Sequence, residues 1–482
     1  MQNNTTLSAI VLAAGLGTRM KSRKAKVLHE AGGQALVEHV LDAAQSSVPV
    51  ERITIVVGHQ AEEVRKRIGD RGCRFVTQTE QHGTGHAVAI CGDISAKDGL
   101  TLLLYGDCPL LTAATITRLV NAQKSSGAAA TLITTMLEDP TGYGRIVRDS
   151  SGGVASIVEQ KVATIAQQQI REINSGIYCI DSELLWKHVR SIVPNPASGE
   201  IYLTDLVELL GRAGKRVEAL VLEDATEILG INHRVELAEA DRILRARKVR
   251  QLMFDGVTIR QPETVAIDSR VQIGQDTIIG ALTQITGDTK IGADCRIGTG
   301  SVIRDSTIAD GVEIGEYCFV GTSVVGTGAR VGPFSRLRQD NHVGENAHIG
   351  NFVELKKTRF GAGAKAMHLA YLGDSVIGAG VNIGAGTITC NYDGVHKHTT
   401  EIGEGVFVGS NSTLVAPVTL APGSYIGAGS VITDEVPADA LAIGRSRRQT
   451  RPAGRRRSAP TSQANWRETP CRRVGMPYND HK

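Results

Sequence analysis

A six-residue repeat in the second half of the chain constrains its fold more than any other feature. An aliphatic residue followed by glycine recurs at Ile273-Gly274, Ile279-Gly280, Ile291-Gly292 and Ile297-Gly298, and the spacing continues, with occasional five-residue steps, to Ile432. Each aliphatic side chain is expected to point inward, and the small residue after it permits a tight corner. Because three hexapeptides make one triangular coil, the repeat predicts a parallel β-helix.

The repeat also explains an unusual composition. The 482 residues include 54 glycines but only 7 Phe, 9 Tyr and 2 Trp. Stacked aliphatic side chains fill a narrow prism without aromatic rings. The hydrophobic content of 41% and the charged content of 21% are those of a folded globular chain, and the length predicts two or three domains.

Several classes of protein are excluded by the same survey. No apolar stretch reaches the roughly 20 residues that span a bilayer, and the N-terminus lacks the basic and apolar regions of a signal peptide. The 8 cysteines are scattered without a CxxC pair, which is typical of free thiols in a reducing compartment. We therefore expect a cytoplasmic protein without a membrane span, a zinc site or a disulfide framework.

The first half of the chain alternates short apolar segments with helical patterns, which predicts an α/β domain with a mostly parallel sheet. Strands are expected at 9–13, 53–57, 100–105, 129–135 and 176–180. Residues 233–253 have apolar positions at helical spacing among mixed charges and predict a connecting helix. The expected organisation is a domain over 1–232, a linker helix over 233–255, a β-helix over 256–445 and a tail over 446–482.

Charge is unevenly distributed along the chain. The formal net charge is +3, yet residues 446–482 hold ten basic and two acidic residues, so the remainder is mildly acidic. A block of like charge rich in Pro, Ser and Arg is typical of a disordered tail. The composition predicts no specific nucleic-acid partner.

Two segments of the first domain predict a phosphate site. The first strand runs into a glycine-rich stretch over 12–33, where small residues let backbone amides approach an anion and Arg19 and Lys26 add positive charge. Asp107 follows the apolar strand LTLLLYG, at the sheet edge where a carboxylate can hold Mg²⁺. The alternatives are an ordinary β-turn for the glycines and a turn-capping role for Asp107.

The hexapeptide pattern is interrupted twice, over 356–376 and over 390–401. The interruptions carry polar side chains that a packed prism does not need: His368, Tyr371, Asn391, Tyr392 and Lys397. His368 is the candidate general base, since imidazole accepts protons near neutral pH. Loop insertions without a function are the alternative.

An ordered set of motifs in the first domain resembles that of the nucleotidyltransferases that make nucleoside-diphosphate sugars. The motifs are LAAGLGTRMKSRKAK, QTEQHGTGHA, YGDCPL, GYGRI, IVEQK, NSGIY and GINHR. With the hexapeptide repeat added, residues 7–446 resemble the bacterial family that joins an N-acetylglucosamine-1-phosphate uridyltransferase to a glucosamine-1-phosphate N-acetyltransferase. The resemblance implies a Rossmann-like domain followed by a left-handed β-helix, a homotrimer through the β-helix, Mg²⁺, and UTP and acetyl-CoA as cosubstrates.

The resemblance also implies the residues of a uridyl-transfer site. Arg19 and Lys26 would be the catalytic cations, and Asp107 and Asn232 the metal ligands. Nucleotide and sugar contacts would come from Leu12, Ala13, Ala14, Gly15, Lys26, Gln78, Gly83, Thr84, Tyr105, Gly106, Asp107, Gly142, Glu159, Asn174 and Asn232. Of these, residues 78, 83 and 84 would contact uracil, and 105, 142, 159 and 174 the sugar. One departure is Ala25, where many relatives have Pro before the lysine.

A second set of residues is implied for acetyl transfer, with His368 as base. The sugar phosphate would be bound by Arg338, Lys356, Tyr371 and Asn382, with Glu354 orienting the site. Acetyl-CoA would be bound by Ala385, Asn391, Tyr392, Ser410, Ala428 and Arg445, in a site shared between subunits. Here the departure is the sequence SRLRQDN around Arg338, where the family usually has Arg-Pro-Gly.

Two other functions were weighed against this one. A hexapeptide zinc enzyme of the γ-carbonic-anhydrase kind would need clustered histidines, but His342 and His348 are six residues apart and therefore fall on successive sides of the prism. A non-catalytic regulatory subunit would use the β-helix only for assembly. The histidine and lysine residues in the interrupted segments favour an enzyme.

Overall fold

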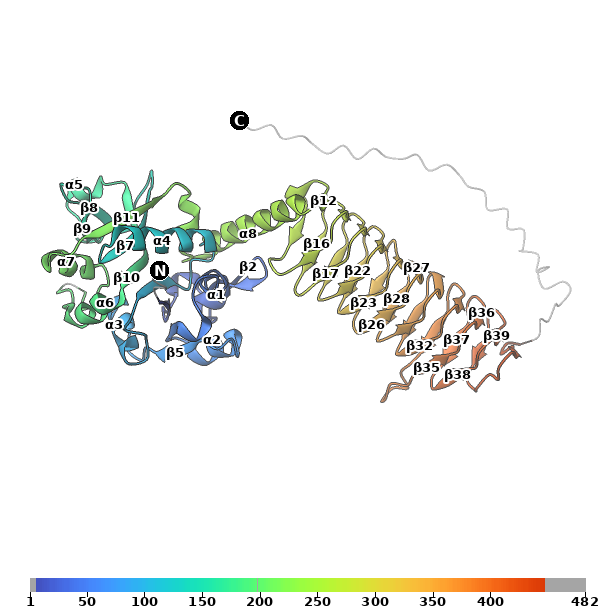
Figure 1. Cartoon of the computed structure of the whole chain (residues 1–482). Helices are drawn as coiled ribbons and strands as arrows, with labels where there is room; N and C mark the ends of the chain where they lie inside the picture. The colour runs from blue at the N-terminus through green and yellow to red at the C-terminus, as the bar shows by residue number, and fades with distance from the viewer. Residues whose placement is uncertain (1–5, 197, 447–482) are drawn as a thin grey trace, which may run out of the picture.

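The computed structural model describes residues 6–196 and 198–446, so the predicted tail lies outside the described residues apart from its first residue. The described chain forms an α/β domain and a long prism, joined by one helix (Figure 1). The two bodies lie at opposite ends of that helix.

A twisted sheet forms the centre of the first domain, in the order β11-β7-β10-β6-β1-β4-β5. Its strands are β1 (Leu7–Ala13), β4 (Ile53–Val57), β5 (Arg74–Thr77), β6 (Leu100–Tyr105), β7 (Ala130–Met136), β10 (Glu172–Asp181) and β11 (Val217–Leu222). All five predicted strands are present and the sheet is mostly parallel, as predicted. The exception is β10, which is longer than expected and runs antiparallel to both of its neighbours, β6 and β7.

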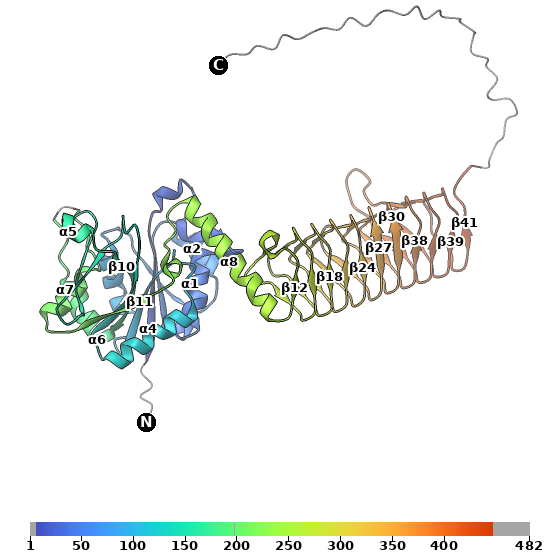
Figure 2. The same ribbon diagram turned by 90° about the horizontal axis from the view of Figure 1, so that it is seen from above.

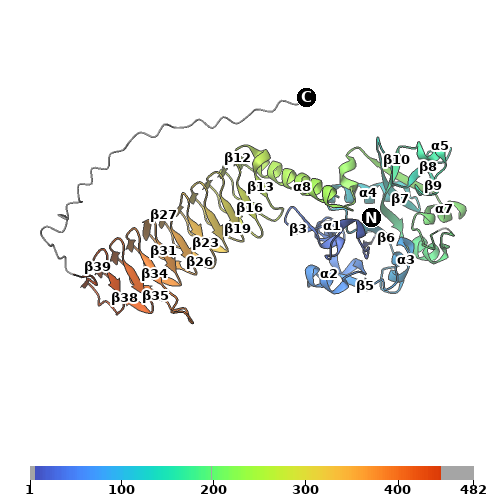
Figure 3. The ribbon, with the colours of Figure 1, turned by 180° about the vertical axis from the view of Figure 1, so that it is seen from behind.

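Helices cover both faces of this sheet (Figure 3). On one face pack α1 (Leu36–Gln45), α2 (Ala61–Ile68) and α4 (Ala113–Ser126). On the other pack α3 (Thr84–Ala89), α6 (Ser182–His188) and α7 (Asp205–Arg212). The hairpin of β8 (Arg145–Arg148) and β9 (Val154–Val158) extends from β10, and α5 (Ile165–Gln168) follows it. With these layers in place, β1 is buried on both faces.

The connecting helix is α8 (Arg234–Phe254), close to the predicted span (Figure 2). A small hairpin, β2 (Glu30–Ala31) and β3 (Gln34–Ala35), reaches across to it from the first domain. The Gly32 amide donates to Asp241 Oδ1 of α8 at 2.8 Å, and the Ser269 amide of the first coil donates to the Gly32 carbonyl at 2.9 Å. Arg245 Nη1 donates to Asp268 Oδ1 at 2.6 Å. The two domains are therefore attached at more than the helix alone.

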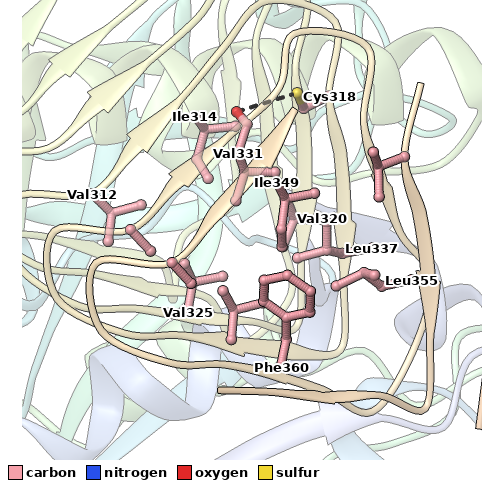
Figure 4. Close-up of a cluster of buried hydrophobic side chains, with 14 of the residues drawn as sticks. Val312, Ile314, Cys318, Val320, Val325, Val331, Leu337, Ile349, Leu355 and Phe360 are labelled. Carbon is pink, nitrogen blue, oxygen red and sulfur yellow. Dashed lines mark hydrogen bonds between the residues drawn. The ribbon is translucent and has the colours of Figure 1, made fainter. Parts of the chain in front are cut away.

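Three parallel sheets build the prism, which is a left-handed parallel β-helix as predicted. The 11-strand face runs from β12 (Thr258–Ile259) to β41 (Leu441–Ala442), the 10-strand face from β13 (Ala266–Ile267) to β40 (Val431–Ile432), and the 9-strand face from β14 (Gln272–Ile273) to β38 (Val418–Leu420). Inward aliphatic residues stack coil upon coil, and Figure 4 shows one such section around Val320, Leu337 and Leu355.

One predicted interruption of the β-helix is wrong. Residues 356–376 continue the coils as β29 (Arg359–Phe360), β30 (Lys365–His368) and β31 (Tyr371–Gly373). Phe360, Ala366 and Leu372 occupy the inward positions, and Leu372 pairs with Leu355 of the coil before. The pattern was missed because the large ring of Phe360 (Figure 4) and the small methyl group of Ala366 replace the usual Ile or Val. The second interruption is a real loop, since β34 (Ile388–Cys390) ends before it and β35 (Thr400–Ile402) begins after it.

The three faces of the prism also bear on the alternative of a hexapeptide zinc enzyme, which would need clustered histidines. His342 lies in β26 (Asn341–Val343) on the 9-strand face, and His348 lies in β27 (His348–Asn351) on the 11-strand face. Within the described ranges no group of three or more His, Cys, Asp or Glu residues is placed to hold a metal ion. Over the same ranges, no helix has both the length and the apolar character needed to cross a membrane.

Candidate active sites

The first candidate site lies at the carboxyl edge of the parallel strands. In the pairing of β1 with β6, Leu12 lies opposite Tyr105, and the Gly106 amide donates to the Leu12 carbonyl at 2.9 Å. The glycine-rich loop and Asp107 therefore leave adjacent strands at the same place. The Ile231 amide donates to the Asp107 carbonyl at 2.9 Å, which brings the next residue, Asn232, to this edge.

Four polar side chains meet there. Lys26 Nζ forms an ion pair with Asp107 and lies 3.3 Å from Asn232 Oδ1. Arg19 Nη2 donates to the same oxygen of Asn232 at 2.8 Å. The structure thus brings the predicted catalytic cations and metal ligands into one cluster. Gly17 makes this possible, because its φ is +61° and a Cβ there would lie 2.6 Å from Lys26 Cβ.

The donors of this cluster fit a divalent cation. Asp107 offers a carboxylate and Asn232 an amide oxygen, and both face the Lys26 ammonium. Magnesium typically takes one or two protein oxygens and completes its shell with water and substrate phosphates. The two oxygens beside the glycine-rich loop therefore fit this pattern.

The residues predicted to contact uracil lie along one short segment. The Gln78 amide donates to the Val57 carbonyl at the end of β4, and Gln78 Nε2 donates to the Gly83 carbonyl at 3.2 Å, which fixes the side-chain amide in one orientation. Thr84 begins α3, and its hydroxyl accepts from the Leu203 amide at 3.1 Å. Gly83 is required by close approach, since a Cβ would lie 2.6 Å from the Ile201 carbonyl oxygen.

Sequence reasoning missed a contact between this segment and the glycine-rich loop. Gln81 Nε2 donates to the Ala14 carbonyl at 2.9 Å. Ala13 and Ala14 are buried, whereas Gly15 is exposed. The loop is therefore anchored by Gln81 where it leaves the strand, and no pattern in the sequence pointed to this contact.

The predicted sugar contacts gather around a bulge in β10. Asn174 Oδ1 accepts from the Gly176 amide and from the Tyr178 hydroxyl, both at 3.1 Å. Tyr105 packs against Gly176, where a Cβ would lie 2.5 Å from the ring. Glu159 Oε1 accepts from the Thr204 hydroxyl at 3.3 Å, and burial raises the pKa of the Glu159 carboxyl.

The second candidate site lies on the β-helix. Arg338 follows β25 (Arg336–Leu337), Lys356 ends β28 (Glu354–Lys356), and Tyr371 begins β31, so all three lie on or at the edge of the 10-strand face. Arg338 Nη1 donates to Glu354 Oε1 at 3.0 Å. The turn that lacks Pro-Gly therefore still holds Arg338 against the predicted orienting carboxylate.

Lys397 joins this group, although sequence reasoning gave it no role. The loop over 391–399 projects from the prism before β35 (Figure 1) and folds back on itself through a bridge between Tyr392 and Lys397. The pKa of Lys356 is lowered, mainly by the Lys397 ammonium and to a smaller extent by partial burial. An ammonium group close enough to lower the pKa of its neighbour, with Arg338 nearby, favours a bound anion such as a phosphate.

His368 lies at the corner between the 11-strand and 10-strand faces, exposed to solvent. Its Nδ1 lies 2.8 Å from Asn351 Oδ1. Because an amide oxygen only accepts, Nδ1 carries the proton and Nε2 is left as the basic nitrogen. Asn351 was missed by sequence reasoning, although it lies 17 residues before His368, at the paired position of the preceding coil.

The remaining predicted residues are divided between two edges of the prism. Ala385, Ser410 and Ala428 continue the corner that carries His368, and Arg445 donates to the Ala428 carbonyl. Asn391 and Tyr392 lie at the opposite edge of the 10-strand face, where Asn391 donates to Asp374. Asn382 lies on the 11-strand face. A single chain does not bring all of these residues together.

This fold and these two clusters define a class: a sugar nucleotidyltransferase joined to a hexapeptide acyltransferase. Comparison with known families agrees. Residues 9–168 match the MobA-like NTP transferase domain, residues 250–355 the EIF2B subunit epsilon LbH domain, and residues 399–434 the bacterial transferase hexapeptide (six repeats).

Whole-chain relatives narrow the class further. The bifunctional protein GlmU of Solibacter usitatus is 57% identical over 92% of this chain and 95% of its own length. The corresponding proteins of Koribacter versatilis and Heliobacterium modesticaldum are 50% and 48% identical over 93% and 91% of this chain, and over 96% of their own lengths. The chain therefore belongs to the bifunctional GlmU family.

Membership establishes the activity. The protein is a bifunctional enzyme of UDP-N-acetylglucosamine synthesis, with an acetyltransferase and a uridyltransferase activity. It acts on small-molecule substrates, among them a nucleotide, and takes a divalent metal ion.

Proposed function

We propose that the two clusters are the two active sites, and that the first domain transfers uridyl groups while the β-helix transfers acetyl groups. The observation that carries the first assignment is the convergence of Arg19, Lys26, Asp107 and Asn232, from segments 81 to 213 residues apart. We propose the domain bounds that the sequence predicted, with the first domain ending at residue 232, the linker helix at 255 and the β-helix at 445.

In uridyl transfer, an oxygen of N-acetylglucosamine-1-phosphate attacks the α-phosphorus of UTP and pyrophosphate leaves. The attacking oxygen is already ionised, so no general base is needed. Arg19 and Lys26 orient the phosphates and compensate their charge. Asp107 and Asn232 would hold Mg²⁺, which neutralises phosphate charge when bound. Gln78, Gly83 and Thr84 bind the uracil, and Leu12, Ala13, Ala14, Gly15 and Gly106 line the phosphate path.

The sugar end is bound by Tyr105, Gly142, Glu159 and Asn174. A carboxylate accepts hydrogen bonds from sugar hydroxyls, and an amide offers both a donor and an acceptor to an N-acetylated ring. The geometry of Glu159 supports this assignment, because its buried carboxylate accepts from the Thr204 hydroxyl and keeps acceptor capacity for a ligand.

In acetyl transfer, the amine of glucosamine-1-phosphate attacks the thioester carbon of acetyl-CoA. The C–N bond forms, the C–S bond breaks, the amine proton passes to His368 Nε2, and CoA leaves as the thiolate before it is protonated. Asn351 holds the required tautomer of His368. Arg338, Lys356 and Lys397 bind the phosphate, and Tyr371 and Asn382 the sugar. Acetyl-CoA contacts come from Ala385, Asn391, Tyr392, Ser410, Ala428 and Arg445.

We further propose a homotrimer whose acetyl-transfer sites lie between subunits. The hexapeptide domain indicates oligomerisation. The division of the predicted residues between two edges of the prism supports sharing, because a neighbouring copy would bring its own corner to the 10-strand face. A threefold ring of such contacts closes on itself.

An apolar ridge along one corner supports this interface. At the corner that carries His368, five apolar residues lie one above another: Leu282, Tyr317, Phe334, Phe352 and Leu369. A glycine takes the position of one coil, directly after Leu282. Each of the five has a positive φ and is about half exposed or more, and the three aromatic rings stack at 5.5 Å. A positive φ is unfavourable for such bulky residues, and their rings are exposed to solvent. Both features indicate a surface that is covered in the assembly.

Location is proposed on chemical grounds. The seven cysteines within the described residues are free thiols, which supports a reducing compartment and hence the cytoplasm.

The test of this function is reconstitution by omission. The purified protein is incubated with glucosamine-1-phosphate, acetyl-CoA, UTP and Mg²⁺, each omitted in turn, and UDP-N-acetylglucosamine is measured. It should form only with all four present. The Lys26→Ala variant should lose uridyl transfer by about 10²–10³-fold and keep acetyl transfer. Equal loss of both activities would refute the separation of the two sites.

A further inference from the structure

Arg145 is the largest fully buried side chain of the described residues and has no obvious role in the fold. It begins β8, paired with Val158 of β9 and Ile173 of β10, and is 1% exposed. Among residues 6–196 and 198–446 no carboxylate forms an ion pair with it, although a buried guanidinium is costly unless it is paired. A neutral side chain would fill the same space at lower cost, so the charge and its fork of donors need a reason.

The guanidinium ties together two segments of the first active site. Its Nη1 donates to the Tyr143 carbonyl, and its Nη2 donates to Gln160 Oε1 at 2.6 Å. Tyr143 follows Gly142, and Gln160 follows Glu159. Both neighbours are among the residues proposed to bind the sugar. The fork of one side chain therefore spans the gap between two sugar-binding segments.

The same two segments touch directly. A Cβ at Gly144 would lie 3.0 Å from Ile157 and 3.7 Å from Glu159 Oε1, so the loop packs against the proposed sugar ligand. The Asn174 amide donates to the Gly144 carbonyl at 2.9 Å, which joins the third sugar-binding segment to the loop. A small displacement of Tyr143 or Gln160 would therefore change the spacing between Gly142, Glu159 and Asn174.

We propose that Arg145 is a positioning residue of uridyl transfer, which sets the width of the sugar subsite by holding the Tyr143 carbonyl and the Gln160 side chain. This inference rests on the proposed sugar contacts. A planar guanidinium can hold two acceptors in a fixed relation, whereas the single ammonium of lysine cannot. The demand for a fork explains why an arginine occupies a buried position where none of the described carboxylates forms an ion pair with it.

The test is the substitution Arg145→Lys, which keeps the charge and removes the fork. The KM for N-acetylglucosamine-1-phosphate should rise at least tenfold, while the KM for UTP stays within twofold of the unchanged enzyme. Gln160→Leu, which removes one of the two acceptors, should give a smaller shift in the same direction. The matched control is Arg148→Lys, three residues along the same strand, whose guanidinium is paired with Glu172.

Acetyl transfer by the same samples reports on the fold of the remote domain, and thermal unfolding reports on the first domain. Equal changes in both KM values, or an equal effect of Arg148→Lys, would show a merely structural role and overturn the proposal. If Arg145→Lys fails to fold, Gln160→Leu alone decides, and an unchanged sugar KM overturns it. Glu159→Ala tests the underlying assignment separately, since an unchanged sugar KM there would refute the sugar site itself.

Discussion

The two proposed active sites of this enzyme are built in opposite ways. In the first domain, Arg19, Lys26, Asp107 and Asn232 converge at one sheet edge within a single chain. On the β-helix, the corresponding residues are spread over two edges of a prism whose faces are straight and repetitive. A parallel sheet collects its loops at one end, whereas a prism offers only corners and flat faces. We therefore expect the acetyl-transfer site to take residues from a neighbouring subunit.

Removal of metal ions should separate the two activities most completely. We expect EDTA to abolish uridyl transfer, because the negative charges of UTP and the sugar phosphate are then left to Arg19 and Lys26 alone. Acetyl transfer should be unchanged, since its proposed residues include no metal ligand. Parallel assays of one sample, with activity restored by excess Mg²⁺, make the measurement. Loss of both activities would contradict the proposed division.

The substitution His368→Ala is expected to have the next largest effect. General-base catalysis contributes about 10²–10⁴-fold, so acetyl transfer should fall by that factor while uridyl transfer persists. Asn351→Leu should give a smaller loss, because it frees the tautomer without removing the base. The assay is release of CoA thiol. Retained acetyl transfer in His368→Ala would exclude this residue as the base.

Mixing two inactive variants tests whether each site is shared. Lys356→Ala alters the 10-strand face and Asn382→Ala the 11-strand face, so random mixed trimers should regain about a quarter of the acetyl-transfer activity if each site takes one face from each of two neighbours. Co-expression of both chains and an acetyl-transfer assay measure the recovery.

The matched control for this mixing is the pair Lys26→Ala and Asp107→Ala, assayed for uridyl transfer. Because that site is complete in one chain, co-expression should restore nothing. Recovery in the control, or its absence for the prism variants, would contradict the contrast between the two sites.

The smallest expected effect comes from the apolar ridge. Phe334→Ser removes the central ring of the stack and should weaken the subunit contact. A loss of one to two kcal/mol in assembly corresponds to roughly a 5- to 30-fold shift in the association equilibrium. Sedimentation at several concentrations measures it, and Val324→Ser on the 9-strand face, also exposed, is the control. Equal sedimentation of the two variants would argue against the ridge as the interface.

Much of this architecture could be predicted from the sequence because its repeats are local. The hexapeptide spacing gave the prism, and the apolar segments gave the five strands. The inward positions of Phe360 and Ala366 were not predicted. The prism requires only that its interior is filled, and a large and a small side chain can fill it together. The reversed direction of β10 depends on long-range pairing, which no local pattern encodes.

The sites show the same limit. Asp107 and the glycine-rich loop were predictable because strand ends point to one sheet edge. Arg145 was not, since its partners lie just outside the two strands of a hairpin, with Tyr143 before β8 and Gln160 after β9. Asn351 could have been found by stepping back one coil from His368, but only after the coils over 356–376 were recognised.

The hairpin that attaches the first domain to the β-helix affects how the intermediate moves from one site to the other. With Gly32 held between Asp241 and Ser269, the domain cannot swing freely about α8. The 21 residues of α8 extend roughly 30 Å, and the six coil steps from β12 to β30 add about 29 Å more. On the proposed assignment of the two sites, we expect N-acetylglucosamine-1-phosphate made beside His368 to pass through bulk solvent, where an unlabelled pool of the same compound would dilute it before it reaches Lys26.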